Sequence, residues 1–173
     1  LFYISFILIS LFCSCKNNVD YLEYALITAG RNRPQLEQVL EYYKDDPEKL
    51  AAAKFLIENM PAHYSYQGED INRYYELAYK IITSNLTPKE QRDSLLSISE
   101  KQFLGLEYRT ISDVKVITSD FLIHNIDAAF EKWKRCEWAS HLTFDDFCEW
   151  LLPYKAVELQ NLDSWRDTLS NYF

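Results

Sequence analysis

Two cysteines and a histidine, Cys136, His141 and Cys148, lie close enough in the sequence to suggest metal or thiol chemistry. Their spacing does not match the paired C-x-x-C or H-x-x-x-H arrangements that bring ligands to one tetrahedral ion, and a fourth ligand is missing. We therefore predict no metal site. A disulfide between Cys136 and Cys148 is one reading for an exported protein. The other places Cys148 in the core and leaves Cys136 as a separate thiol.

Nucleophilic catalysis would require one of these thiols to have a lowered pKa, which a helix N-terminus or a neighbouring imidazole can provide. Neither cysteine lies at a predicted helix start. His124 lies beside an apolar helix stripe, which is typical of a packed or half-exposed histidine. The carboxylate pairs, such as Asp145 with Asp146, fit helix caps and surface charges. We assign no catalytic residue and expect no cofactor.

Aromatic side chains are the better candidates for a binding surface. Trp133 and Trp165 lie on helix stripes and are predicted to be core residues, whereas Trp138 and Trp150 are not assigned to the core. Exposed aromatic rings can stack on sugars or hold peptide side chains. The candidate binding surface comprises His63, Tyr64, Tyr66, Trp138 and Trp150. In the alternative reading, Tyr64 and Tyr66 pack a helix junction and His63 is solvated.

The composition of the 173-residue chain indicates one helical domain. Its 48% hydrophobic content is ample for a core, and only 3 glycines leave few places for tight turns or phosphate-binding loops. The net charge of −8, without a cluster of Lys and Arg, argues against a nucleic-acid partner.

Apolar residues recur with helical spacing along most of the chain, often after capping residues. The predicted caps include Thr87 with Glu90, Thr143 with Asp146, and Ser119 or Asp120. The main stripes include Leu122, Ile126, Ala129 and Trp133 in one segment and Ile71, Tyr74, Tyr75 and Ala78 in another. We predict an all-α fold, an irregular bundle of about six to seven helices. The periodic segments are 22–29, 36–43, 50–60, 69–84, 88–102, 122–133, 144–151 and 162–172.

Two stretches between these segments lack helical spacing. Residues 61–68 are predicted to be an irregular connection. Residues 103–118 contain β-formers, including Thr110 and Val114, but show no evident partner strand. We interpret this second stretch as a connection with a helical turn after Ser112.

The N-terminal residues 1–12 form an uninterrupted apolar run that is too short to span a bilayer and has the length of a secretory signal core. The sequence that follows resembles the lipobox of bacterial lipoproteins, with Ser14 before Cys15 as the lipidated residue. We expect 1–14 to be a truncated lipoprotein signal, 15–20 a tether, and 21–173 a helical module truncated at both ends. The alternatives are an ordinary cleaved signal and a buried apolar helix.

Three further segments carry a family resemblance: LIENMPAHYSY (56–66), SDFLIHNIDAAFEKWK (119–134), and FDDFCEWLLPYK (144–155) with the later Trp165 and Arg166. They resemble the N-terminal region of bacterial lipoproteins that carry a transglutaminase-like domain. The resemblance implies a Cys-His-Asp site on a papain-like core downstream of this region. No cysteine here matches that nucleophile. Where relatives tend to have arginine, this chain has Lys155, which cannot pair a carboxylate in bidentate fashion.

The expected function is thus that of a non-catalytic helical N-terminal module that positions, covers or feeds a transglutaminase-like or peptidase-like domain. Its expected partners are membrane lipid, through acylated Cys15, and the downstream domain of the same polypeptide. The expected location is the envelope of a Gram-negative bacterium, on the periplasmic face or the cell surface. A free-standing surface lipoprotein that binds glycan or peptide through exposed aromatics is the alternative. A purely structural envelope lipoprotein is a third reading.

Overall fold

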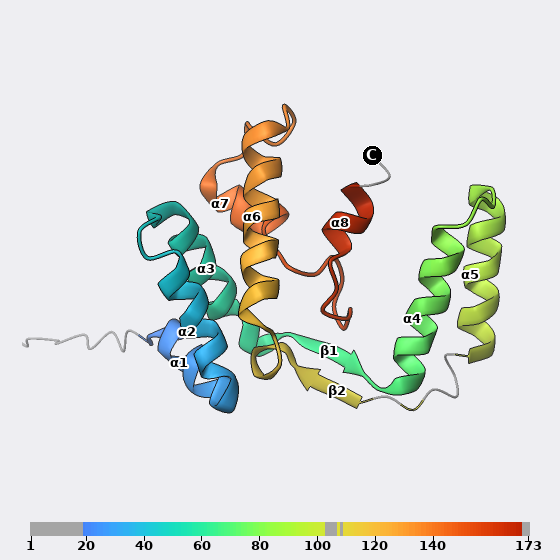
Figure 1. Ribbon diagram of the computed structural model, residues 1–173, viewed down its shortest axis with the longest axis horizontal. Coiled ribbons are helices and arrows are strands. Elements are labelled where there is room, and N and C mark those ends of the chain that lie inside the picture. Colours follow the sequence, from blue (N-terminus) through green and yellow to red (C-terminus); the bar gives the residue numbers. More distant parts are fainter. Residues whose placement is uncertain (1–18, 103–106, 108, 171–173) are drawn as a thin grey trace, which may run out of the picture.

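The computed structural model describes residues 19–102, 107 and 109–170. Cys15 and the predicted signal segment lie outside the described residues. The described part is a helical body with a projecting helical hairpin, and its one sheet is small (Figure 1). The predicted all-α class is confirmed. The main helices are α1 (Tyr21–Ala29), α2 (Arg33–Tyr42), α3 (Pro47–Asn59), α4 (Glu69–Ile82), α5 (Pro88–Gln102) and α6 (Ser119–Arg135).

Local capping signals explain where the first helices begin and end. The Asp20 carboxylate accepts a hydrogen bond from the Glu23 backbone N–H at the start of α1, and Asp46 does the same for Lys49 in α3. Gly30 ends α1 at a φ of 59°, a backbone conformation that side chains with a Cβ disfavour. These boundaries follow from the sequence, because each cap involves residues within one turn.

The long helix α6 provides the main wall of the core. Its predicted stripe is buried, and comprises Leu122, Ile126, Ala129 and Trp133. The helix is capped by Thr118, whose side chain accepts a hydrogen bond from the Phe121 N–H, and not by Ser119 or Asp120 as we predicted. The Ser119 hydroxyl instead lies against Gln35 and Gln38 of α2, a contact that local sequence does not reveal.

An aromatic cluster closes the core beside α6. Trp133 stacks on Phe147 with ring centroids 4.3 Å apart. Phe130 contacts the Phe147 ring edge-on, with ring centroids 4.8 Å apart. Phe147 belongs to a π-helical turn, η5 (Phe147–Leu151), which follows α7 (Phe144–Asp146) and its predicted Thr143 capping box. Trp133 is therefore a core residue, as predicted.

The two connections that we predicted to be irregular pair with each other. Strands β1 (Tyr64–Gln67) and β2 (Arg109–Ser112) form an antiparallel two-stranded sheet in which Tyr64 is opposite Ser112 and Gln67 is opposite Arg109. The prediction was wrong because each strand is only four residues long and its partner lies some forty residues away. The predicted helical turn after Ser112 is confirmed as η4 (Asp113–Lys115).

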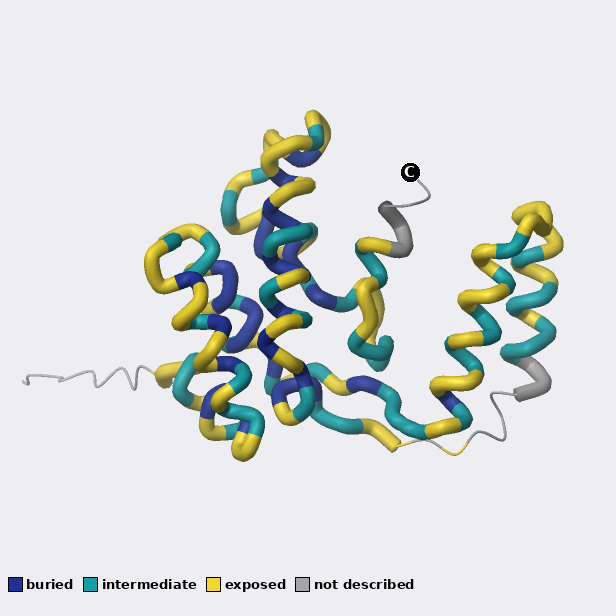
Figure 2. Tube along the Cα trace, in the orientation of Figure 1, coloured by how far each residue is buried: buried dark blue, intermediate teal, exposed yellow. Residues whose placement is uncertain are grey.

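Helices α4 and α5 form a hairpin that stands apart from the body and is joined to it through the sheet (Figure 1). Its second helix begins with the predicted Thr87–Glu90 capping box, in which the Thr87 N–H and hydroxyl both donate to the Glu90 carboxylate. Figure 2 shows mostly exposed and intermediate residues along both helices. The hairpin exposes several large apolar side chains, namely Tyr79, Ile82, Leu86 and Leu96.

The chain beyond η5 passes between the body and the hairpin and ends in α8 (Trp165–Ser170) (Figure 1). The Arg166 guanidinium fixes this segment by donating to the Asn125 side chain at 2.9 Å and to the carbonyls of Pro153 and Leu151. Trp165, predicted to be a core residue, is only half-buried and donates its indole N–H to the Tyr154 carbonyl. The predicted helix 162–172 thus begins later, at Trp165, and its last residues lie outside the described part.

Candidate functional site

Strand β1 directs alternate side chains to two different environments. Ser65 points into the protein and is buried, whereas Tyr64 is exposed and Tyr66 is half-buried. The strand therefore links an internal polar cluster to the molecular surface.

The internal cluster, which we call the Asp113 cluster, comprises Ser65, Asp113, Tyr154 and Lys155. The Asp113 carboxylate is fully buried and accepts hydrogen bonds from the Ser65 hydroxyl at 2.5 Å and the Tyr154 hydroxyl at 2.9 Å. The Lys155 ammonium pairs with it at 2.6 Å and also donates to the Tyr64 carbonyl. Burial, and then the Asp113 charge, raise the pKa of Tyr154 well above its usual range. The charges compensate each other, so the cluster fixes β1, η4 and the chain after Leu152 together.

A histidine–carboxylate pair flanks this cluster. His63 Nδ1 lies 2.9 Å from the Glu158 carboxylate, which also accepts a hydrogen bond from the Tyr64 N–H. Burial raises the pKa of Glu158, but the hydrogen bonds from His63 and Tyr64 outweigh this effect and hold the pKa below its usual value. The pair thus secures the C-terminal segment against the start of β1.

His63 and Cys148 both line a hollow of about 270 Å³ between α3 and the chain after η5. Burial, followed by the nearby charges of Asp145 and Glu149, raises the pKa of the Cys148 thiol to about 11. A thiol with a raised pKa is a poor nucleophile at neutral pH. Cys136 and Cys148 are both free cysteines, in agreement with the reading that they are separate thiols.

A larger depression, the tyrosine groove, lies between β1, α4 and the C-terminal segment, with a volume of about 630 Å³. Its lining includes three apolar side chains, Ile111, Val116 and Leu162. The other lining residues are the buried Ser65 and a set of tyrosines and polar residues: Tyr66, Gln67, Asn72, Tyr75, Glu76, Tyr79, Asn161 and Asp163.

The backbone after Lys155 positions the C-terminal side of the tyrosine groove. Leu159 adopts a φ of 63°, which is uncommon for a branched side chain, and its carbonyl accepts a hydrogen bond from the Tyr66 N–H at 3.2 Å. The Asn161 amide then reaches across to the Asn72 side chain of α4, at 3.3 Å. Body and hairpin therefore meet at this groove.

The electrostatic environment of the tyrosine groove is acidic. Burial raises the pKa of Tyr75, and the neighbouring Tyr66 and Asp163 raise it further. Among the described residues that line the groove, the charged ones are Glu76 and Asp163. Arg109 lies beside the groove, with its Nε 3.1 Å from the side-chain oxygen of the lining residue Gln67. A depression lined by apolar side chains, tyrosines and two carboxylates can accommodate a ligand that has an aliphatic part and a positive charge.

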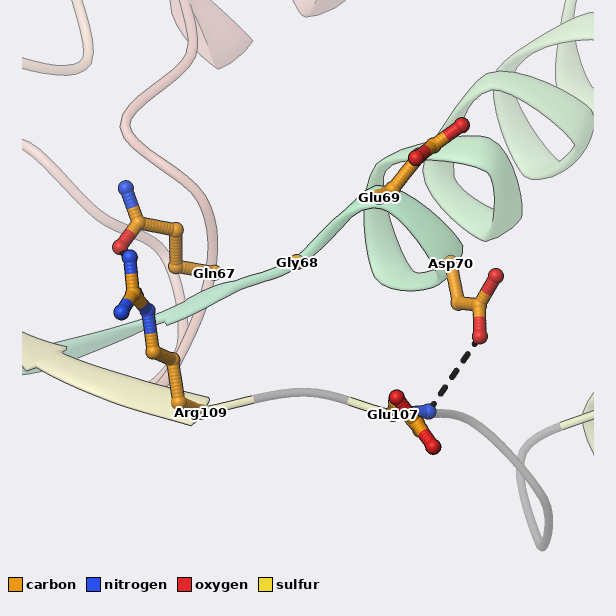
Figure 3. Close-up of a pocket in the computed structure, with 6 residues that line it drawn as sticks. All are labelled: Gln67, Gly68, Glu69, Asp70, Glu107 and Arg109. Carbon is orange, nitrogen blue, oxygen red and sulfur yellow. Dashed lines mark hydrogen bonds between the residues drawn. The ribbon is translucent and has the colours of Figure 1, made fainter.

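A second surface hollow, of about 500 Å³, lies where the sheet meets α4. Figure 3 shows Arg109 beside Gln67, with its Nε 3.1 Å from the Gln67 side-chain oxygen, and Asp70 facing the Glu107 backbone. The Glu69 carboxylate points away from the other two acidic side chains, so the three do not converge. Within the residues that the structure describes, no group of three His, Cys, Asp or Glu residues is arranged to hold a metal ion.

The structure places the predicted binding residues in separate locations. Tyr66 lines the tyrosine groove, and His63 lines the hollow beside Cys148. Tyr64 is exposed on β1, Trp150 is 80% exposed on η5, and Trp138 is 66% exposed in the loop that follows α6. That loop lies at the end of α6 opposite the sheet (Figure 1). Tyr66 is thus the member of the predicted set that contributes to the groove.

Sequence reasoning missed the other groove residues, including Tyr75, Tyr79, Asn161 and Asp163. Tyr75 falls in a helical stripe that we interpreted as packing, and the segment around Asn161 lacks any periodic pattern. The signal that could have identified the two tyrosines is the grouping of tyrosines at positions 74, 75 and 79 on one helix.

A search of protein-family models found no match to the chain, and searches of curated proteins and of solved structures likewise found none. In the part of the chain that the structure describes, none of the helices has the length and apolar character required to cross a membrane.

Proposed function

We propose that the chain is a non-catalytic helical module of a membrane-anchored lipoprotein that carries a transglutaminase-like domain in its full form. The sequence resemblance and the lipobox-like segment at Cys15 suggest this role. The structural observation that carries it is the projecting α4–α5 hairpin, because its exposed apolar side chains, including Ile82, Leu86 and Leu96, offer a surface for another domain of the same polypeptide.

The environment of the reactive groups supports a non-catalytic role for this segment. The Cys148 thiol has a raised pKa, which opposes thiolate formation. Lys155 and Asp113 neutralise each other inside the fold. Each of these groups contributes to the packing of the body.

Labelling of the expressed full-length protein tests the anchor. Radiolabelled palmitate should be incorporated into the wild type in a Gram-negative host and into the matched Cys13→Ser variant, but not into Cys15→Ser. Equal labelling of Cys15→Ser would rule out Cys15 as the lipidated residue.

Hydrogen–deuterium exchange tests the domain contact. Amides of 69–102 should exchange at least about tenfold more slowly in the full-length protein than in the 21–173 module alone, because a docked domain would protect the hairpin. Amides of α2, on the body, are the internal reference. Unchanged exchange in the hairpin would refute docking at this surface.

A second candidate function is that of a surface lipoprotein that binds glycan or peptide through aromatic side chains. The tyrosine groove favours it, since Tyr66, Tyr75 and Tyr79 line one depression of suitable size. Titration of the 21–173 module with oligosaccharides and peptides tests this role.

A further inference from the structure

We propose that the tyrosine groove binds the lysine or arginine side chain of a polypeptide. This inference deepens the binding role given above as the second candidate function, and it does not depend on lipidation at Cys15. It rests on the shape of the groove, on its aromatic walls and on its charge.

The groove has an apolar part that matches an aliphatic stem. Ile111 comes from β2, Val116 from the chain after it and Leu162 from the C-terminal segment, and all three line the same depression. Lysine and arginine side chains bury their methylene groups on such a surface and keep the charged head at its edge.

Two acidic residues provide the charge that a cationic head requires. Glu76 of α4 and Asp163 of the C-terminal segment line the same depression, and they are the charged residues among its described lining. The nearby Arg109 donates to the side chain of the lining residue Gln67 at 3.1 Å. The Asp163 carboxylate accepts a hydrogen bond from the neutral Gln160 amide at 2.9 Å, and neither acid forms an ion pair within the described part of the chain. Both carboxylates can therefore pair with a cation from a ligand.

The tyrosines favour a cation over a sugar ring. Tyr66 and Tyr75 are half-buried, and Tyr79 is 54% exposed, so the groove does not present a flat platform of open ring faces. A cation needs only part of a ring face within about 6 Å, and its attraction to the ring adds to that of the carboxylates. The net charge of −8 also draws basic polypeptides to the protein.

Calorimetric titration of the 173-residue chain tests the proposal. The probe is the acetylated and amidated pentapeptide Ala-Ala-Lys-Ala-Ala, and the matched ligand has norleucine in place of lysine. The lysine peptide should bind at least about tenfold more tightly, and its affinity should fall as salt rises, because salt screens partly exposed charges. Failure of the lysine peptide to bind, or equal affinity for the two peptides, would overturn the proposal.

Three variants locate the site. The double variant Glu76→Gln/Asp163→Asn should weaken lysine-peptide binding at least tenfold, and Tyr79→Ala should weaken it about threefold. Glu137→Gln, an exposed residue in the loop after α6, removes one negative charge elsewhere and should leave affinity unchanged. A loss in Glu137→Gln as large as half of the loss in binding free energy in Glu76→Gln/Asp163→Asn would show a general charge effect and overturn the site assignment.

Maltohexaose serves as the neutral carbohydrate probe. The protein could bind maltohexaose but not the lysine peptide, and lose maltohexaose binding in Tyr79→Ala. That result would overturn the proposal of a cationic ligand and would retain a binding role for the groove. Absence of binding by both probes would refute the cationic ligand and weaken the second candidate function as well.

Discussion

Replacement of Lys155 by methionine removes the cation that faces the buried Asp113 carboxylate. The Lys155 side chain is only 6% exposed and the Asp113 side chain 0%, so water cannot substitute for the lost ammonium. Removal of one partner of a buried ion pair typically costs about 3–5 kcal/mol. Because the Ser65 and Tyr154 hydroxyls still donate to Asp113, we expect the low end of that range. The lost hydrogen bond to the Tyr64 carbonyl adds about 1 kcal/mol, for a total of about 4 kcal/mol.

Urea unfolding followed by tryptophan fluorescence measures this loss. The matched control is Lys44→Met, at a lysine whose side chain is 57% exposed and pairs with Glu41 on the surface. That variant should change the free energy of unfolding by no more than about 0.5 kcal/mol. A loss below about 1 kcal/mol for Lys155→Met, at an unchanged m value, would refute the reasoning that the Asp113 cluster stabilises the fold.

Two further variants separate charge from shape at this site. The double variant Asp113→Asn/Lys155→Met should be at least about 1 kcal/mol less destabilised than the sum of the single variants, because it leaves no unpaired charge. Lys155→Arg keeps the charge but places a larger planar group in a closely packed site, and should cost about 1–2 kcal/mol.

Phe147→Ala should lower the free energy of unfolding by about 3–5 kcal/mol in the same urea assay, because the fully buried ring stacks on Trp133, and a loss below about 1 kcal/mol would contradict the core assignment. At pH 8, peptide-resolved alkylation should modify Cys136 at least about tenfold faster than Cys148, whose pKa of about 11 leaves about one thiol in a thousand ionised; equal rates would contradict the raised pKa. The same raised pKa contributes stability that is present below about pH 9 and is lost as pH rises through about 11, so Cys148→Ala should flatten the pH dependence of unfolding in that window. Thr87→Ala should destabilise the start of α5 by about 1 kcal/mol, seen as faster amide exchange in 88–92, and unchanged exchange would show that the cap is dispensable.

The helices could be predicted because their signals are local. Asp20, Asp46 and Thr143 each cap a helix within one turn of the residues that they contact, and the buried stripe of α6 follows the helical repeat. Even here the predicted cap of α6, Ser119 or Asp120, lies one or two residues after the actual cap, because Thr118, Ser119 and Asp120 are all competent capping residues. The Ser119 hydroxyl instead forms a hydrogen bond with the side chain of Gln35 in α2.

The sheet and the groove could not be predicted in the same way. The pairing of Tyr64 with Ser112 joins segments separated by the whole α4–α5 hairpin, and four-residue strands have little pattern of their own. Tyr75 follows a helical stripe that would normally pack on a neighbouring helix. Its exposure to a groove depends on where the Asn161 segment passes, and that path is set by tertiary contacts.

The Asp113 cluster connects the stability of the fold to the geometry of the tyrosine groove. Ser65, a member of this cluster, lies in β1 directly before the groove residue Tyr66, and Lys155 begins the segment that leads to Asn161 and Asp163. The buried Asp113 carboxylate thus fixes β1 and the C-terminal segment, which both line the groove, relative to each other. Neither Asp113 nor Lys155 itself lines the groove. It follows that Lys155→Met should weaken binding in the groove as well as stability, whereas Phe147→Ala, in the aromatic core, should affect stability alone at temperatures where both variants remain folded.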